Sequence, residues 1–130
     1  MQIKSAKELV AYQKAYRLAM EVFELSRAWP LEEKYSLTDQ IRRSSRSVCA
    51  NLREAWSKRR HEAHFVSKLT DCDGENGETD TWLDFAKDCE YMSLDDHTRL
   101  TAECAEVGSI LGAMLKNPGP FLIHPPTSDS

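Results

Sequence analysis

The residues best suited to bind another molecule are seven basic residues between positions 42 and 60. Four of them are separated by four, seven and seven positions, so on an α-helix they fall within about 40° of one another. A guanidinium group donates two parallel hydrogen bonds to a phosphate, and a row of such groups contacts successive phosphates of a nucleic acid. The four are Arg42, Arg46, Arg53 and Arg60, and the three basic residues beside them are Arg43, Lys58 and Arg59. This row is therefore a candidate binding surface for RNA or DNA.

The distribution of charge allows a second interpretation of the same residues. Residues 1–60 carry 13 Lys and Arg against 7 Asp and Glu, whereas residues 61–130 carry 4 against 14, so the net charge of −4 conceals a basic and an acidic half. The arginines can pair with acidic residues of the fold or lie on a solvated helix flank. The acidic residues suited to such pairing include Asp73, Glu78, Asp80 and Asp84. In a symmetric oligomer, however, the row repeats as a basic surface that favours nucleic-acid contact.

The residue types that support catalysis or metal binding do not form a recognisable set. His61 and His64 are three positions apart, whereas a zinc protease motif needs four, and there is no glycine-rich phosphate loop. The cysteines have no CxxC spacing, so we expect reduced thiols that act as small apolar residues rather than a zinc site or disulfides. They are Cys49, Cys72, Cys89 and Cys104. We therefore predict a protein that is not an enzyme and has no metal and no cofactor.

The elements that must carry these residues are helices. The 130 residues allow one core, and five Gly and five Pro are too few for a sandwich or a barrel. Helical periodicity covers residues 5–29, 38–60, 61–89 and 93–117, with Ser5, Thr38 and Ser93 as helix-start signals. This predicts an all-α fold, an antiparallel up-and-down four-helix bundle over residues 1–117, followed by a flexible C-terminal tail over residues 118–130. With no membrane-spanning run and no signal sequence, we expect no membrane contact and a cytoplasmic location.

Two of the predicted helices have one clear buried face. In the third, a single row of residues runs unbroken through a centre weakened by Gly74 and Gly77. Its members are Phe65, Leu69, Cys72, Asn76, Thr79, Leu83 and Ala86. In the second helix the buried row is Ile41, Ser45, Val48, Leu52 and Ala55 or Trp56.

The first helix has two apolar rows, about 130° apart by helix geometry. One contains Leu9, Tyr12, Tyr16, Ala19 and Phe23, and the other contains Leu18, Val22, Leu25 and Trp29. One row serves the core, and the other needs a further surface to cover it. We predict that Leu18, Val22, Leu25 and Trp29 form the interface of a homo-oligomer; the alternative is a helix wedged between two neighbours in the same chain.

A series of motifs from Trp29 to Glu54 follows a recognisable pattern. After Trp29-Pro30, residues 33–44 read E-x-Y-x-L-x-x-Q-I-R-R-S, and residues 47–54 read S-V-x-x-N-L-R-E. Residues 78–86 read E-T-D-T-W-L-D-F-A and are followed by Tyr91-Met92. These motifs resemble those of the 23S rRNA intervening-sequence protein family, also called four-helix bundle proteins, and the resemblance spans about residues 7–116.

The resemblance implies a left-handed antiparallel four-helix bundle that assembles as a ring-like homopentamer. A relative, the accessory variability protein of diversity-generating retroelements, binds nucleic acid and its reverse transcriptase through a basic surface. The resemblance therefore suggests a nucleic acid or a nucleic-acid-processing protein as partner, although no activity is established for most members. A protein-assembly module that binds no nucleic acid remains the alternative.

The chain departs from the family pattern in three ways. Arg53-Glu54-Ala55 stands where the family has A-E-G, residues 72–75 replace A-x-G-S with a more acidic sequence, and the chain is acidic overall, unlike the basic retroelement proteins. The polar residues that do match are expected to act structurally, in the connector between the first two helices or in a hydrogen-bonded network between helices. They are Tyr35, Gln40, Arg43, Ser47, Asn51 and Glu54, and Arg43 is expected to pair with Glu78 or Glu54.

Overall fold

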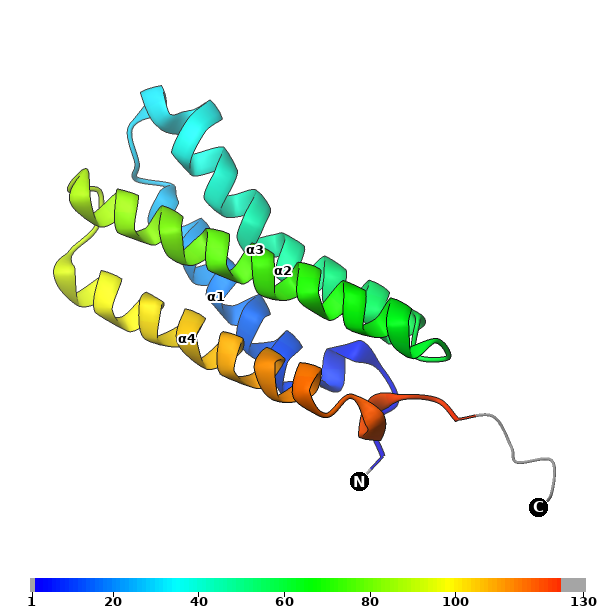
Figure 1. Ribbon diagram of the computed structural model, residues 1–130. Helices are drawn as coiled ribbons and strands as arrows, with labels where there is room; N and C mark the ends of the chain where they lie inside the picture. The colour runs from blue at the N-terminus through cyan, green and yellow to red at the C-terminus, as the bar shows by residue number, and fades with distance from the viewer. Residues whose placement is uncertain (1, 125–130) are drawn as a thin grey trace, which may run out of the picture.

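The chain folds as the predicted four-helix bundle in a computed structural model that describes residues 2–124 (Figure 1). The helices are α1 Val10–Ser26, α2 Asp39–Ser57, α3 Glu62–Asp88 and α4 Leu94–Lys116. Each helix runs antiparallel to the one before it, and α4 returns to pack on α1, so every helix has two neighbours. No β-strand occurs among the described residues. The predicted all-α class and four-helix bundle are confirmed.

The buried faces of α2 and α3 are those that the sequence predicts. All seven residues of the α3 row, from Phe65 to Ala86, are buried, including the polar Asn76 and Thr79. The predicted row of α2, from Ile41 to Trp56, is buried as well. The glycines of α3 do not interrupt it, because the packed apolar face on either side holds the helix together.

Three polar side chains of the core form hydrogen bonds between helices. The hydroxyl oxygens of Ser44 and Thr79 lie 2.8 Å apart where α2 crosses α3. The amide Nδ2 of Asn76 donates to the carbonyl oxygen of Cys104 on α4 at 2.9 Å. Gly108 allows this approach, because a Cβ there would lie 3.3 Å from the same amide nitrogen. These contacts fix the position of α3 relative to both of its neighbours.

The orientation of α1 differs from the prediction. Leu18, Val22 and Trp29 are buried in the core of the single chain, and Leu25 is half-buried against the same cluster. The prediction that these residues form an oligomer interface is therefore wrong. The small side chains of Ala11 and Ala15 share the inner face and let α1 approach the bundle closely, which turns the row of tyrosines toward the side.

Several helix ends also differ from the prediction. Thr38 does not cap α2, because a π-helical turn over Lys34–Thr38 leads directly into it, and Glu33 caps that turn instead. Ser5 caps a short 3-10 helix, Ala6–Glu8, rather than α1. Ser93 caps α4 as expected by accepting a hydrogen bond from the Asp96 amide.

The chain stays in contact with the bundle after α4. A second 3-10 segment, Leu31–Glu33, follows α1, and a third, Gly119–Phe121, follows α4. The Phe121 ring stacks near Phe65, with centroids 6.4 Å apart, and the Ile123 amide donates to the Arg59 carbonyl oxygen at 3.1 Å. The packed chain thus extends past residue 117, where we expected a flexible tail to begin. The rest of the predicted tail, residues 125–130, lies outside the described residues.

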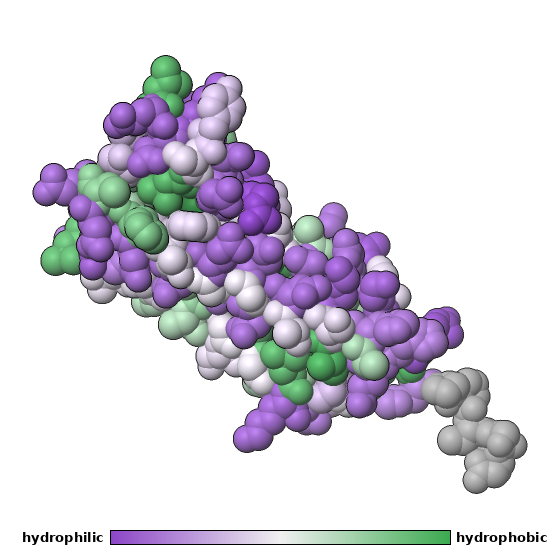
Figure 2. Space-filling view, turned by 45° about the horizontal axis from the view of Figure 1, so that its top comes forward, coloured by the Kyte–Doolittle hydropathy of each residue, from purple (hydrophilic) through white to green (hydrophobic). Residues whose placement is uncertain are grey.

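Large apolar side chains are exposed at the end of the bundle opposite the termini. Figure 2 shows hydrophobic side chains gathered over that end. The most exposed of these residues, which we call the end patch, are Leu31, Tyr35, Phe85 and Leu94. No helix among the described residues is long and apolar enough to cross a membrane.

Candidate nucleic-acid interface

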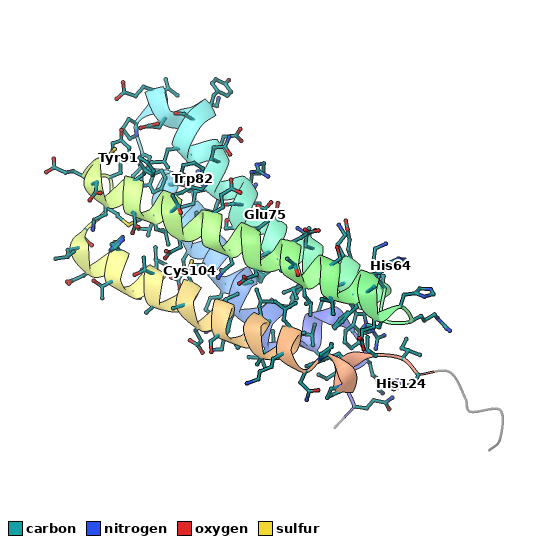
Figure 3. All side chains as sticks on the ribbon, viewed as in Figure 1. His64, Glu75, Trp82, Tyr91, Cys104 and His124 are labelled. Carbon is teal, nitrogen blue, oxygen red and sulfur yellow. The ribbon has the colours of Figure 1, made fainter. Side chains whose placement is uncertain are left out.

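Histidines and cysteines do not converge on a site within residues 2–124. In Figure 3, His64 and His124 lie toward the end of the bundle that carries the termini, and Tyr91 lies at the other end. The cysteines are free thiols; three are buried, and burial raises the pKa of Cys49 to about 11 and of Cys72 and Cys104 to about 12. No group of three metal-ligating side chains occurs among these residues.

Three arginines of the predicted row line the side of α2 that faces α1. Arg46 and Arg53 are exposed, whereas Arg42 is half-buried and its Nε donates to the Ser26 hydroxyl at 2.8 Å. The guanidinium of Arg42 lies 4.9 Å from the centre of the Phe23 ring, and that of Arg46 lies 5.7 Å from it. No carboxylate within the described chain lies within ion-pair distance of these three arginines. The alternative of internal ion pairs therefore does not apply to them.

The other basic residues of the candidate site are placed differently. Because α2 ends at Ser57, Lys58 and Arg60 lie exposed in the turn before α3 rather than on the helical row. Arg43 faces α3, where its guanidinium lies 3.0 Å from Glu78 and 3.8 Å from Glu75. Arg59 stacks on Trp56 at 3.5 Å and donates to its carbonyl oxygen, and burial lowers the pKa of Arg59. Arg43 and Arg59 thus already have partners within the chain.

The aromatic residues beside these arginines come from α1. Tyr12 and Tyr16 stack with centroids 6.2 Å apart, and Tyr16 and Met20 are exposed. Burial raises the pKa of Tyr12, and nearby Cys49 and Tyr16 add to this effect. We call this surface the α1–α2 face; it consists of Tyr12, Tyr16, Met20, Phe23, Arg42, Arg46 and Arg53. The sequence contained a signal for its aromatic half, because the tyrosines and Phe23 share one row of α1.

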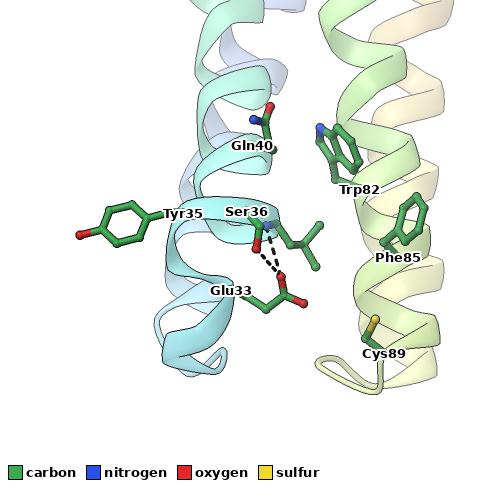
Figure 4. A pocket seen from close by; sticks show the side chains of 8 residues that line it. Glu33, Tyr35, Ser36, Gln40, Trp82, Phe85 and Cys89 are labelled. Atoms are coloured by element: carbon green, nitrogen blue, oxygen red, sulfur yellow. Dashed lines mark hydrogen bonds between the residues drawn. The ribbon is translucent and has the colours of Figure 1, made fainter.

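The connector between α1 and α2 is held by a residue that we did not single out. Glu33 accepts hydrogen bonds from the Ser36 hydroxyl at 2.6 Å and the Tyr91 hydroxyl at 2.8 Å, and it also accepts from the Leu37 amide. These bonds lower the pKa of Glu33, and the bond to Glu33 raises that of Tyr91 to about 12. Tyr35, expected in this role, is 82% exposed and points away from α3 (Figure 4).

A groove of about 560 Å³ separates this connector from α3. Figure 4 shows Gln40 and Ser36 on one side and Trp82, Phe85 and Cys89 on the other. Gln40 therefore lines the groove beside the connector. Since Phe85 is 53% exposed here, the groove is continuous with the end patch.

The remaining matched polar residues join α2 to α3. Asn51 donates to the Ser47 carbonyl oxygen at 3.0 Å, and Lys68 of α3 lies 3.5 Å from the Asn51 amide oxygen and 2.8 Å from Glu54. The Lys68 bond lowers the pKa of Glu54, and the same bond raises that of Lys68. With the Arg43–Glu78 pair, these contacts line the side of α2 away from α1, so the ion pairs of α2 lie on the side that faces α3.

The fold and the α1–α2 face define a small helical bundle with a basic, aromatic side surface. The sequence model of the 23S rRNA-intervening sequence protein family matches residues 7–113. The chain belongs to this family, which confirms the resemblance found in its motifs.

A solved structure and the curated proteins complete the comparison. The crystal structure of a protein with unknown function from the S23 ribosomal protein family of Bacteroides thetaiotaomicron has 28% sequence identity to the chain and a TM-score of 0.75. The similarity covers 83% of this chain and 96% of that one. No curated protein matches. Neither the family nor this neighbour indicates an enzymatic activity.

Proposed function

We propose that this protein is a non-enzymatic accessory protein that binds nucleic acid through the α1–α2 face. The observation that carries the proposal is the set of three arginines, Arg42, Arg46 and Arg53, beside which no carboxylate of the described chain is found. An arginine with no carboxylate partner in the fold gains most from a phosphate, because the bidentate contact is charge-assisted on both sides. The position of Arg43 and its acidic partners on the other side of α2 supports this division of roles.

The distribution of charge over the bundle agrees with the proposal. The acidic excess of residues 61–130 belongs to α3 and α4, whereas the arginine row lies against α1. An overall acidic protein is repelled by nucleic acid unless its basic residues are gathered on one side. Here they are gathered along α2, whose span from Arg42 to Arg53 is about 16 Å at the rise of an α-helix.

We further propose that the working unit is a ring-like homo-oligomer, with five copies expected. The support in this chain is the end patch, whose side chains are 53–83% exposed and two of whose members, Tyr35 and Phe85, line a groove of about 560 Å³. Exposed large apolar side chains gathered at one end of a small protein are typical of an interaction site. In such a ring the α1–α2 face of each copy repeats and strengthens binding through multiple contacts.

A protein-assembly module without nucleic-acid binding is the second candidate function. The same end patch favours it, since that surface suits a protein partner rather than a phosphate. The two functions differ in one measurable property, the dependence of binding on salt. Nucleic-acid binding through n arginine–phosphate contacts weakens steeply with salt, whereas apolar association does not.

The experiment replaces the three arginines of the α1–α2 face, giving Arg42→Gln/Arg46→Gln/Arg53→Gln. Binding of labelled RNA and DNA oligonucleotides is followed by fluorescence anisotropy between 50 mM and 200 mM salt. We expect the wild-type protein to bind at low salt and the variant to lose at least tenfold in affinity. The slope of log Kd against log salt should fall by about 2–3, since each phosphate contact contributes about 0.7–0.9.

A matched variant controls for the change in net charge. Lys34→Gln/Lys87→Gln/Lys116→Gln removes the same charge from residues outside the α1–α2 face, and its affinity should stay close to that of the wild type. Absence of binding at low salt, or equal losses in the two variants, would contradict the proposal and leave the assembly module as the function.

A further inference from the structure

The α1–α2 face contains a groove lined by apolar and aromatic side chains and by one arginine. The groove has a volume of about 240 Å³ and is lined by Tyr12, Tyr16, Ala19, Met20, Arg46 and Cys49. Tyr16 is 54% exposed and Met20 is 45% exposed, although both are large and apolar enough to be covered. A surface that binds only phosphates does not require exposed apolar side chains beside its arginines, because water solvates the arginines well without them.

The antiparallel packing of α1 and α2 places the arginines of α2 beside the aromatic residues of α1. The Cys49 thiol lies 3.9 Å from the Tyr12 carbonyl oxygen, where the two helices meet. Arg46 lines the same groove as Tyr16, and the guanidiniums of Arg42 and Arg46 both lie over the Phe23 ring. The charge of Arg53 acts to lower the pKa of Tyr12, against the larger effect of burial. The face thus combines aromatic rings from α1 with guanidiniums from α2.

This combination of aromatic rings and guanidiniums fits a nucleic acid whose bases are unpaired. In a duplex the base faces stack on one another, so only phosphates and groove edges meet a flat protein surface. In a single strand the base faces are free to stack on aromatic side chains while cations follow the backbone. Only the single strand satisfies both halves of the α1–α2 face.

We propose that the α1–α2 face binds single-stranded nucleic acid, with a base stacked on Tyr16 and the adjacent phosphates on Arg46 and Arg53. The inference rests on the proposed function and specifies its ligand. Because the contacts address base faces and phosphates, which RNA and DNA share, both single strands fit the face equally.

The test compares single strands and duplexes of equal length, in RNA and in DNA, by anisotropy at low salt. We expect single strands to bind at least tenfold more tightly than duplexes. Tyr16→Leu should weaken single-strand binding by about tenfold, the effect of losing one stacked base, and leave duplex binding unchanged. Tyr16→Phe, which keeps the ring, should bind as the wild type does, and 2-aminopurine in the strand should be quenched by the wild type and not by Tyr16→Leu.

Val10→Ala is the matched control, because Val10 is an apolar residue of α1 that is as exposed as Tyr16, at 54%, and lies outside both the α1–α2 face and the end patch. It should leave every affinity unchanged, and thermal melts should show that all variants fold. Equal affinity for duplex and single strand, no loss with Tyr16→Leu, or a preference above tenfold for one sugar would overturn the inference. If the arginine variant still weakens binding in that case, the proposed function stands; if no salt-sensitive binding occurs at all, both fail.

Discussion

At the scale of single residues, two hydroxyl groups are the most constrained polar atoms of the core. Ser44 and Thr79 are fully buried, and Thr79 also donates to the Glu75 carbonyl oxygen at 3.0 Å. With that proton engaged, the Ser44 hydroxyl donates to Thr79, and its other acceptor, the Ile41 carbonyl oxygen, lies farther away at 3.3 Å. The pair therefore acts as one unit between α2 and α3.

This arrangement predicts that the two hydroxyls are energetically coupled. Thr79→Val keeps the shape of the side chain but leaves the Ser44 hydroxyl with only its longer bond, so it should cost about 1–2 kcal/mol of unfolding free energy. The double variant Thr79→Val/Ser44→Ala should lose less unfolding free energy than the sum of the losses in the two single variants, by about 0.5 kcal/mol or more. Urea unfolding measures this cycle. Thr70→Val, which removes a similar but exposed bond to Val66, is the control and should cost little; strictly additive costs in the core would contradict the coupling.

At the residue scale, the sequence did not predict which polar side chain holds the connector between α1 and α2. Residues 33–44 indicate a family motif, but the motif does not say which of its polar members is anchored. Tyr35 points away from α3. Glu33 is anchored instead, because the hydroxyl of Tyr91, in the turn after α3, donates a hydrogen bond to it. A partner 58 residues away leaves no local signal. Three members of the arginine row, Arg42, Arg46 and Arg53, could be predicted, because helical spacing decides which of these side chains share a face, whereas Arg60 lies beyond the end of α2.

At the scale of elements, α3 and α1 show why one helix was predicted correctly and the other was not. The row of α3 is unique, because only one face carries apolar or small polar residues throughout. Two rows compete in α1, and the sequence cannot rank them, since the choice depends on the shape of the neighbouring helices. The bundle selected the face with Ala11 and Ala15, whose small side chains allow close packing, over the larger tyrosines.

The glycines of α3 give a prediction about this helix. A Cβ added at Gly74 or Gly77 meets no atom within 4 Å, and both residues are exposed. Gly74→Ala and Gly77→Ala should each raise the unfolding free energy by about 0.5–1 kcal/mol, because alanine restricts the unfolded chain more than glycine does. Thermal and urea unfolding measure the change.

Gly108→Ala in α4 is the matched control for these substitutions. Its Cβ would lie 3.3 Å from the Asn76 amide that bonds to Cys104, so the gain in helix propensity is offset by displacing that amide. We expect no gain or a loss of stability. A stabilisation at Gly108 equal to that at Gly74 would mean that the contact between α3 and α4 is looser than described.

At the scale of the whole molecule, the surface separates into regions with different partners. The basic and aromatic residues of the α1–α2 face lie along the side formed by α1 and α2, and the exposed apolar residues lie at the end opposite the termini (Figure 2). In the proposed oligomer, this separation would leave the α1–α2 face open while the end patch contacts other copies. The rows of single helices could not predict it, because the end patch is assembled from the connector, the end of α3 and the start of α4.

The end patch predicts how assembly responds to substitution. Multi-angle light scattering at micromolar concentrations should give five times the 14.8 kDa of one chain for the wild-type protein. Tyr35→Glu/Phe85→Glu should lower the mass to that of smaller species, because covering Phe85 contributes about 1.5–3 kcal/mol per subunit and a buried carboxylate opposes association. Val10→Glu, at a residue of α1 that is 54% exposed and outside the end patch, should keep the wild-type mass. A monomeric wild type would refute the oligomer, whereas an unchanged mass in the double variant would move the interface away from the end patch and onto another surface of the bundle.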